Sequence, residues 1–412
     1  RIITSYKQKN KEHSITETGI LEFYNRNAMV WDNDQKIASF ITSKDTEILN
    51  FAKNSTNWMR SVQNPAIDEN FQKAIALFQS VKEYGIQYEV DPSTPFATFS
   101  KESFSIDYLQ FPRQTLQYTS GDCDDLTVLY TSLLEAVGVE SAFITVPGHI
   151  FAAFALKDPI DDIKKTFHNH EELIFLDDKA WIPIEITLFQ EGFNTAWLAG
   201  AKEWRENSME EKSVLWPTRV AWNTFNAVGY RDDAVRITLP DRDRVVESIQ
   251  ESISSVVRRE IFEQESTLQQ RLQQNQNDVV SKNKLALLYA RYGMYERAIT
   301  EFKNITENTA YLPALINLAN LYYLKDDLET AMDYYTDALN IRSNAVSALV
   351  GFARCNYELE NYGIVRETYQ KITLLNPEIA DRFSYLDMRS NETERASSMK
   401  NLRSYVVWED EQ

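Results

Sequence analysis

The C-terminal part of the chain repeats itself, and this repeat constrains the fold more than any other feature of the sequence. Three stretches within residues 278–379 carry small and aromatic residues at matching helical positions. The matching sets are Ala286, Tyr289, Ala298 and Phe302, then Ala319, Tyr322, Ala331 and Tyr335, then Ala353, Tyr357, Val365 and Tyr369. Self-similarity at a period of about 34 residues is typical of stacked helix pairs, because a single unit cannot bury its apolar face alone. We therefore expect three helix pairs, with Phe302 and Tyr335 packed between helices.

The segments on either side of the repeat also predict helices. Apolar residues recur at helical spacing from Pro240 to about Leu272, and Pro240 suits a helix start. We assign residues 240–277 to a long linker helix and residues 380–412 to a capping helix with a polar tail.

The start of the chain predicts a β-hairpin. Residues 1–8 and 14–25 are rich in strand-forming side chains and flank the polar residues 9–13. Two strands alone are marginally stable, so a hairpin within residues 1–40 is expected to end a missing upstream β domain or to pack on the domain after it. The chain begins with Arg1 and carries no charged-then-apolar leader, from which we expect further natural sequence upstream.

Residues 41–239 predict an α+β domain. Two amphipathic helices are expected at 45–62 and 67–84, and a third comes after residue 122. The predicted strands occupy residues 141–147, 149–156, 173–177 and 181–187, with a charged loop or short insertion at 158–172 and an aromatic-rich helical region at 189–230. Strands that follow a helix, and do not alternate with helices, indicate an antiparallel sheet.

Three residues of this domain together offer nucleophilic chemistry. A thiol nucleophile needs a lowered pKa, a base and a group that orients the base. Cys123 follows the helix-cap candidate Asp122, so the helix dipole favours its thiolate. His149 opens a strand after a Pro-Gly bend, where it can serve as the base. In the strand 181–187, alternation places Glu185 opposite the isoleucines and toward a cleft, where it can hold the imidazole.

Composition excludes several other classes. The only cysteines, Cys123 and Cys355, lie in different predicted domains, which leaves no disulfide framework or cysteine zinc site. The net charge of −18, from 43 Lys and Arg against 61 Asp and Glu, argues against a nucleic-acid partner. The sequence contains no uninterrupted run of about 18 apolar residues, so it predicts no membrane-spanning helix. With no phosphate-loop motif, and no third ligand near His168 and His170, we expect neither a cofactor nor a metal.

Three motifs resemble the transglutaminase-like superfamily of the papain-like cysteine fold. The resemblance covers roughly residues 40–230. It is carried by GDCDD at 121–125 with the helix after it, PGHIFAAF at 147–154 and WIPIEIT at 181–187. The repeat, in turn, resembles the tetratricopeptide repeat. The expected fold is therefore an α+β papain-like or transglutaminase-like core with an antiparallel sheet, followed by an all-α tetratricopeptide-repeat domain.

The resemblance also implies roles for the site residues. Cys123 matches the family's nucleophile and His149 its base. The third position is most often Asp in the family, so Glu185 departs from the pattern, and Asp177 and Asp178 remain alternatives for it.

Together the two resemblances imply an enzyme. A Cys-His-Glu triad would perform thiol-dependent acyl transfer or hydrolysis at peptide or carboxamide bonds. Resolution by water would make a cysteine protease or amidase, and resolution by an amine a cross-linking acyltransferase; we favour hydrolysis. The protein would be bacterial and extracytoplasmic, in the periplasm or at the surface, and its repeat groove would bind a protein substrate or partner. The alternative is a non-catalytic interaction scaffold that retains the fold without turnover.

Overall fold

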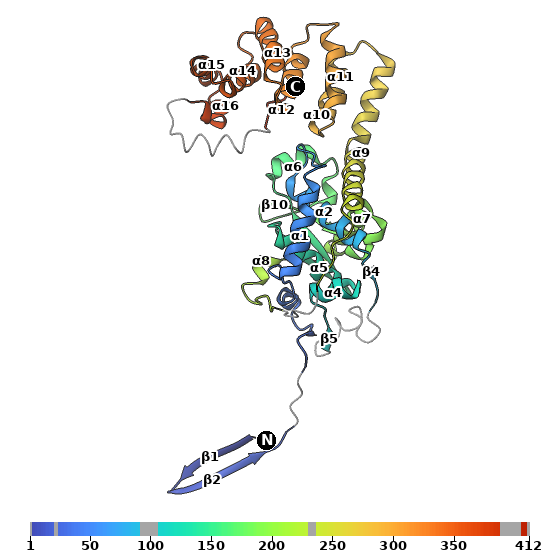
Figure 1. Cartoon of the computed structure of the whole chain (residues 1–412), viewed down its shortest axis with the longest axis vertical. Helices are drawn as coiled ribbons and strands as arrows, with labels where there is room; N and C mark the ends of the chain where they lie inside the picture. Colours follow the sequence, from blue (N-terminus) through green and yellow to red (C-terminus); the bar gives the residue numbers. More distant parts are fainter. Residues whose placement is uncertain (1, 20–23, 91–105, 230–235, 388–404, 410–412) are drawn as a thin grey trace. The chain divides into compact units, whose positions relative to one another are not determined.

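The structure is a computed structural model that describes residues 2–19, 24–90, 106–229, 236–387 and 405–409 (Figure 1). The chain divides into two compact units. The first comprises Arg1–Ser55, Ser80–Phe154 and Pro183–Asp241, and the second comprises Thr56–Gln79, Ala155–Ile182 and Arg242–Gln412. The boundary predicted near residue 240 coincides with one of these divisions, whereas residues 56–79 and 155–182 group with the helical second unit.

A five-stranded sheet has the strand order β11-β7-β8-β10-β9. Its strands are β7 (Ser141–Val146), β8 (His149–Ala155), β9 (Ile174–Leu176), β10 (Lys179–Ile184) and β11 (Val214–Pro217). Every residue of β7 is buried, and so is all of β8 after the half-buried His149, which shows that both faces of these strands are covered. The neighbouring strands β7 and β8 run antiparallel, as do β11 with β7 and β10 with β9. The predicted α+β class with an antiparallel sheet is confirmed.

Helices come before, between and after these strands in the sequence. They are α1 (Thr46–Met59), α2 (Glu69–Tyr84), α4 (Pro112–Tyr118), α5 (Cys123–Ala136), α6 (Ile160–Thr166), α7 (Phe193–Ser208) and α8 (Thr218–Ala221), with short 3-10 helices η1 (Asp34–Ser39), η2 (His170–Glu172) and η3 (Ile186–Glu191). Short strand pairs join β3 (Ala28–Val30) to β5 (Ile106–Tyr108) and β4 (Gln87–Tyr88) to β6 (Ser120–Gly121). The stripe expected on α5 is buried, because every residue of this helix up to Leu134 is covered by the core.

Two segments of this region differ from the sequence prediction. The loop predicted at residues 158–172 contains α6 and η2, and Ile163 of α6 is 1% exposed, so packing supplies a helix that the charged sequence did not indicate. The region 189–230, predicted as helical, contains the strand β11. Its Trp216 pairs with Phe143 of β7, a partner that lies far away in the sequence.

The N-terminal hairpin consists of β1 (Ile2–Gln8) and β2 (Lys11–Glu17). The second strand begins earlier than the predicted residue 14 and ends before the predicted residue 25. Lys9 and Asn10 both have positive φ angles, of 50° and 62°, and form a two-residue turn that sets this register. All residues of both strands are exposed.

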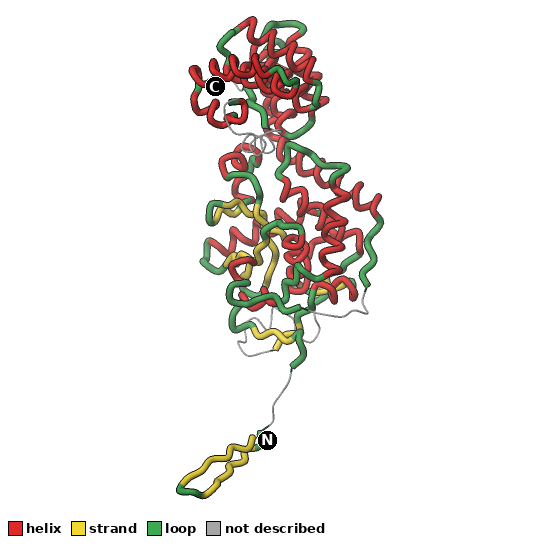
Figure 2. The backbone as a smooth tube through the Cα atoms, turned by 60° about the vertical axis from the view of Figure 1, so that its left-hand side comes forward, coloured by secondary structure: helices red, strands yellow, loops and turns green. Residues whose placement is uncertain are grey.

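The C-terminal part of the second unit is helical (Figure 2). The long helix α9 (Arg242–Gln274) precedes three helix pairs and a short closing segment. The pairs are α10 (Val279–Arg291) with α11 (Tyr295–Thr306), α12 (Leu312–Leu324) with α13 (Leu328–Ile341) and α14 (Val346–Glu358) with α15 (Tyr362–Leu375), followed by α16 (Pro377–Arg382) and η4 (Ser384–Leu386). Phe302 and Tyr335 are both fully buried, as the repeat predicts.

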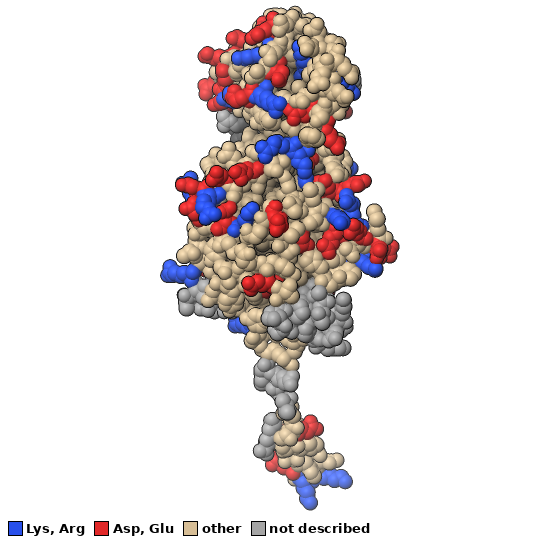
Figure 3. Space-filling model, turned by 90° about the vertical axis from the view of Figure 1, so that its right-hand side faces the viewer, with Lys and Arg blue, Asp and Glu red and all other residues tan. Residues whose placement is uncertain are grey.

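The surface reflects the composition of the chain. Acidic and basic side chains are interspersed on the face drawn in Figure 3. Among the residues that the structure describes, no helix is both long and apolar enough to cross a membrane.

Candidate functional site

Cys123 is the first residue of α5, and the backbone before it is held tightly. Gly121 of β6 pairs with Tyr88 of β4. A Cβ atom at Gly121 would lie 2.7 Å from the Cβ of Asp125, so only glycine allows this close approach. The Asp122 backbone N–H donates to the Asp125 carboxylate at 3.4 Å, which closes the first turn of the helix. The thiol is thereby fixed at a helix start, as predicted.

The acidic residues around Cys123 have a structural role. The carboxylate of Asp125 also accepts the Gln110 backbone N–H at 2.6 Å, so it ties α5 to the segment before α4. Burial and the neighbouring charge of Asp122 raise the pKa of Asp124 and that of Asp125.

His149 and Glu185 are brought into direct contact. The Pro147–Gly148 bend, in which Gly148 has a φ of 80°, places His149 at the first position of β8. His149 Nε2 lies 2.6 Å from Glu185 Oε2. The other carboxylate oxygen of Glu185 accepts the Thr187 backbone N–H at 3.1 Å and the Thr187 hydroxyl at 2.6 Å. Both oxygens of this carboxylate are therefore engaged, which fixes its orientation toward the imidazole.

The route by which Glu185 reaches His149 differs from the prediction. The strand ends at Ile184, and Glu185 is the cap of η3. Trp181 and Ile182 are 1% and 0% exposed, so both faces of the strand are buried and its alternation does not select a cleft side. The Glu185 carboxylate is oriented by the turn from β10 into η3, and not by the alternation of side chains along the strand.

Helix α7 packs closely on this turn. The Glu185 backbone N–H donates to the Ala196 carbonyl at 2.9 Å. A Cβ atom at Gly200 would lie 2.9 Å from the Pro183 carbonyl carbon and 3.0 Å from the Glu185 nitrogen. Glycine at position 200 therefore permits the approach that holds Glu185 in place.

Asp177 and Asp178, the alternative orienting residues, form the turn between β9 and β10. Both have positive φ angles, of 51° and 57°, and both are exposed. The carboxylate that contacts His149 is that of Glu185.

The electrostatic surroundings of the thiol oppose the sequence prediction. Burial and the charge of Asp122 raise the pKa of the Cys123 thiol well above its usual range. The backbone of Ile150 acts in the opposite sense on this pKa, but it does not offset the burial. The expected lowering of the thiol pKa is therefore wrong, because desolvation of a thiol that is 5% exposed outweighs the helix dipole.

Cys123 belongs to the same buried cluster as Ile150, the residue after His149. Among the described residues, no hydrogen bond joins Cys123 to the imidazole. A direct contact of thiol and imidazole stays a prediction.

The imidazole and its carboxylate shift in the directions that favour an ion pair. Burial alone would lower the pKa of His149, but the hydrogen bond and charge of Glu185, with the charges of Glu203 and Asp122, raise it. Burial alone would raise the pKa of Glu185, but its bonds to His149 and Thr187 lower it. The His149 side chain is 23% exposed and that of Glu185 only 7%, so solvent reaches the pair from the imidazole side.

Two residues near the site had no signal in the sequence. Glu203 of α7 brings a third ligand atom to within 4.8 Å of those of His149 and Glu185, but in sequence it is one more acidic residue on a polar helix. Tyr88 of β4 pairs with Gly121, and its pKa is raised by burial and by the charges of Cys123 and Asp122.

Among the residues that the structure describes, two groups of side chains could hold a metal ion. One is His149 with Glu185 and Glu203, and the other is Asp122 with Cys123 and Asp124; within each group the ligand atoms lie within 4.8 Å of one another. An ion in the first group would bind to both His149 and Glu185, and so would compete with their direct contact. His168 and His170 do not converge, because the first contacts Glu263 at 2.9 Å and the second the Lys164 carbonyl at 3.0 Å.

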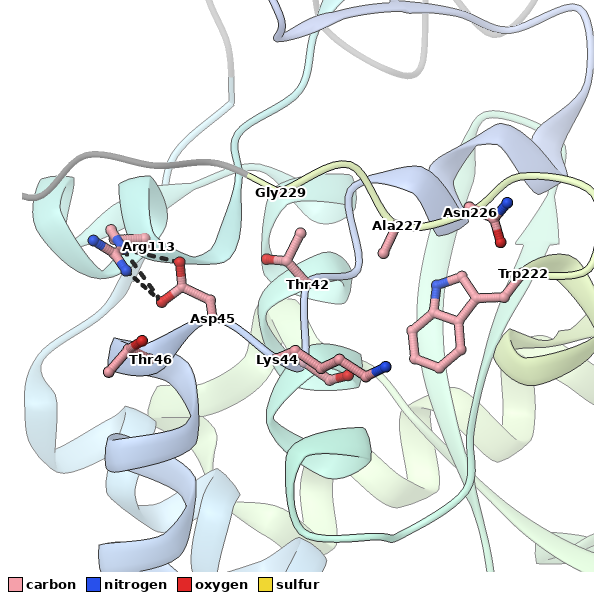
Figure 4. A pocket seen from close by; sticks show the side chains of 10 residues that line it. Thr42, Lys44, Asp45, Thr46, Arg113, Trp222, Asn226, Ala227 and Gly229 are labelled. Carbon is pink, nitrogen blue, oxygen red and sulfur yellow. Dashed lines mark hydrogen bonds and ion pairs between the residues drawn. The ribbon is translucent and has the colours of Figure 1, made fainter.

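A separate cavity of about 660 Å³ lies in the first unit (Figure 4). Arg113 and Asp45 at its edge form an ion pair, with Nη2 2.8 Å from Oδ1. Lys44 and Trp222 extend into it from opposite sides. None of the three candidate catalytic residues lines this cavity.

No protein-family model matches the chain, and no curated protein matches it either, so its own residues carry the functional conclusion.

Proposed function

We propose that the protein is a thiol-dependent acyl-transfer enzyme or hydrolase acting on peptide or carboxamide bonds, as its resemblance to the transglutaminase-like superfamily implies. The observation that supports this proposal best is the 2.6 Å contact between His149 Nε2 and Glu185 Oε2, in the same unit as a cysteine at a helix start. Because Nε2 faces the carboxylate, Nδ1 is the ring nitrogen left to exchange a proton with Cys123.

The reaction proceeds in two halves. The Cys123 sulfur attacks the carbonyl carbon and forms a C–S bond while its proton passes to His149. The carbonyl oxygen becomes an oxyanion, for which the Cys123 backbone N–H is a donor, since first-turn N–H groups lack helical partners. The imidazolium then protonates the departing amine as the C–N bond breaks. Water or an amine, deprotonated by His149, releases the acyl group from sulfur, and of these two we favour water.

The pKa shifts of the three site residues determine the pH at which this reaction can proceed. The raised pKa of Cys123 keeps the resting thiol protonated, so attack requires a base. The lowered pKa of Glu185 keeps its carboxylate charged, so it stabilises the imidazolium that forms. The raised pKa of His149 means that the free base becomes available only as the pH rises through that pKa.

The second candidate is an interaction scaffold without turnover. The raised thiol pKa favours it, because an unassisted thiol of this kind would be inert. In both cases we assign the helix pairs, which resemble tetratricopeptide repeats, to binding a protein substrate or partner. The resemblance also leads us to place the protein outside the cytoplasm of a bacterium.

Iodoacetamide labelling near neutral pH, followed by mass spectrometry, separates the two candidates. Cys355 serves as an internal control, since it is fully buried and burial raises its pKa to about 12. The enzyme predicts that Cys123 is labelled much faster than Cys355 and that His149→Ala removes this advantage. If Cys123 is labelled slowly, and at the same rate in His149→Ala, the enzyme candidate is wrong and the scaffold candidate is supported.

A further inference from the structure

The residues Tyr405–Glu409 lie on the helix pairs and have no helix or strand of their own. They contact α12 and α14, the first helices of the second and third pairs. We call this surface the α12–α14 face and define its polar part by Asn317, Asn320 and Arg354.

The two asparagines of α12 bind backbone atoms of the C-terminal residues. Asn317 uses both ends of its amide on one residue: Nδ2 donates to the Glu409 carbonyl at 2.9 Å, and Oδ1 accepts the Glu409 N–H at 2.8 Å. Asn320 Nδ2 donates to the Val407 carbonyl at 2.9 Å. Such contacts hold a peptide whatever its side chains, because every residue offers the same backbone groups.

A third backbone contact comes from α14. Arg354 Nη1 donates to the Tyr405 carbonyl. The carbonyls held are thus those of alternate residues, 405, 407 and 409. Alternation with a period of two is the geometry of an extended chain.

The side chains of the segment alternate in the same way. Val406 and Trp408 pack against the apolar cluster of α12, α13 and α14. Tyr405 and Val407 pack against a second cluster, of α14, α15 and the residues after them. The Glu409 carboxylate accepts a hydrogen bond from the Ser347 hydroxyl.

The polar groups of the face are held by other parts of the array. The Tyr335 hydroxyl donates to Asn320 Oδ1 at 2.6 Å. Arg354 Nε donates to the Tyr385 hydroxyl at 3.0 Å, and its guanidinium lies 4.4 Å from the centre of the Tyr323 ring. These contacts do not involve residues 405–409, so side chains of the array itself help to orient the polar groups of the face.

The polar groups are buried in the occupied face. Asn317, Asn320 and Arg354 are 0%, 2% and 2% exposed with Tyr405–Glu409 in place. Each hydrogen bond that the segment makes there contributes roughly 0.5–1.5 kcal/mol, so the face favours a chain that offers carbonyl groups at the same spacing.

We propose that the α12–α14 face is a binding site for an extended peptide segment, and that Tyr405–Glu409 is its intramolecular occupant. The ligand in trans is a protein segment with the same pattern: an aromatic residue, two β-branched residues, a large aromatic residue and an acid. This inference rests on the partner-binding role proposed for the helix pairs and gives that partner its chemistry. An occupant tethered to the site competes at an effective concentration in the millimolar range, so the resting chain resists a partner until its own segment is displaced.

The test measures binding of a fluorescent pentapeptide with the sequence of residues 405–409, blocked at both ends, to the full chain by fluorescence anisotropy. Val406→Asp should weaken the intramolecular occupant, because Val406 is 6% exposed in an apolar cluster. We expect this variant to bind the peptide at least tenfold more tightly than the unaltered chain. Adding Asn317→Ala to it should reverse the gain at least tenfold.

The matched control is Leu374→Asp, the same kind of change at a residue that is 86% exposed, and it should bind like the unaltered chain. Trp408→Ala is a milder second variant and should give a smaller gain than Val406→Asp.

Two results would overturn the proposal. Variants that keep the helical thermal transition but bind the peptide no better than the unaltered chain would show that the face takes no ligand in trans. Variants that lose this transition would show that the segment is a core element and not a displaceable ligand. Iodoacetamide labelling of Cys123 in the same variants reports separately on the proposed thiol chemistry.

Discussion

Glu185→Gln tests the candidate site most directly, because it keeps the shape of the side chain and removes its charge. In the structure, Oε1 accepts two hydrogen bonds from Thr187 and Oε2 contacts His149. A glutamine that keeps the Thr187 bonds must turn its NH₂ group toward Nε2. That group is a donor, so it favours the imidazole tautomer with the proton on Nδ1, which is the nitrogen that has to accept the thiol proton.

The magnitude is set by the hydrogen bond that is lost. A hydrogen bond to a charged group contributes roughly 1.5–3 kcal/mol. The imidazolium cannot donate to the NH₂ group that replaces Oε2, so it loses this bond entirely, which corresponds to roughly a tenfold to hundredfold change in an equilibrium or rate. The unfavourable tautomer adds to this loss. We expect Cys123 to be alkylated at least about tenfold more slowly near pH 7.

The assay is the rate of iodoacetamide alkylation across pH, followed by mass spectrometry with Cys355 as the internal reference. Glu203→Gln is the matched control: its carboxylate also lies within 4.8 Å of the imidazole, but burial raises its pKa and no hydrogen bond joins it to His149 among the described residues. Its effect should be smaller. If Glu185→Gln alkylates at the unaltered rate while its circular dichroism and melting are unchanged, Glu185 does not orient the base.

The remaining predictions concern pH and packing. Because the pKa of His149 is raised, the alkylation rate should rise with pH through a midpoint above the ordinary imidazole pKa of about 6.5; a midpoint at or below it would contradict the assigned environment. By linkage, His149 stabilises the fold fully below its unfolded pKa, and this contribution should be lost as the pH rises through its folded pKa, as denaturant titrations at several pH values would show. Gly200→Ala should lower the free energy of unfolding by about 1–3 kcal/mol and slow alkylation, because its Cβ would lie 3.0 Å from the Glu185 nitrogen; unchanged denaturation would refute this close contact. Asp45→Ala should cost about 3–5 kcal/mol in the same measurement, because it removes the carboxylate that pairs with the guanidinium of Arg113 at 2.8 Å, and the Arg113 side chain is only 10% exposed.

Sequence patterns predicted helices and strands correctly where contacts between residues close together in the sequence determine them. The start of α5 at Cys123 was indicated by the cap at Asp122, and the strand after Gly148 by the Pro-Gly bend. The helix pairs were indicated by residues spaced by three and four, as the buried Tyr335 illustrates. These features depend on contacts within one turn of helix or one strand, which the sequence displays directly.

Features that depend on distant residues were missed. No local signal marked β11, because its pairing partner β7 is far away in sequence. The sign of the pKa shift at Cys123 was also mispredicted, since the helix dipole is visible in the sequence while desolvation is a property of the assembled core.

The amino-acid sequence by itself determined the α+β class, the helical period of the C-terminal part and the choice of Cys123, His149 and Glu185 as candidates. Only the tertiary structure decided that Glu185 reaches His149 from the turn after β10, that Glu203 lies beside them and that the last described residues lie on α12 and α14. The physical reason is that periodicity encodes which face of an element is apolar, whereas the meeting of two polar groups depends on how elements distant in the chain pack.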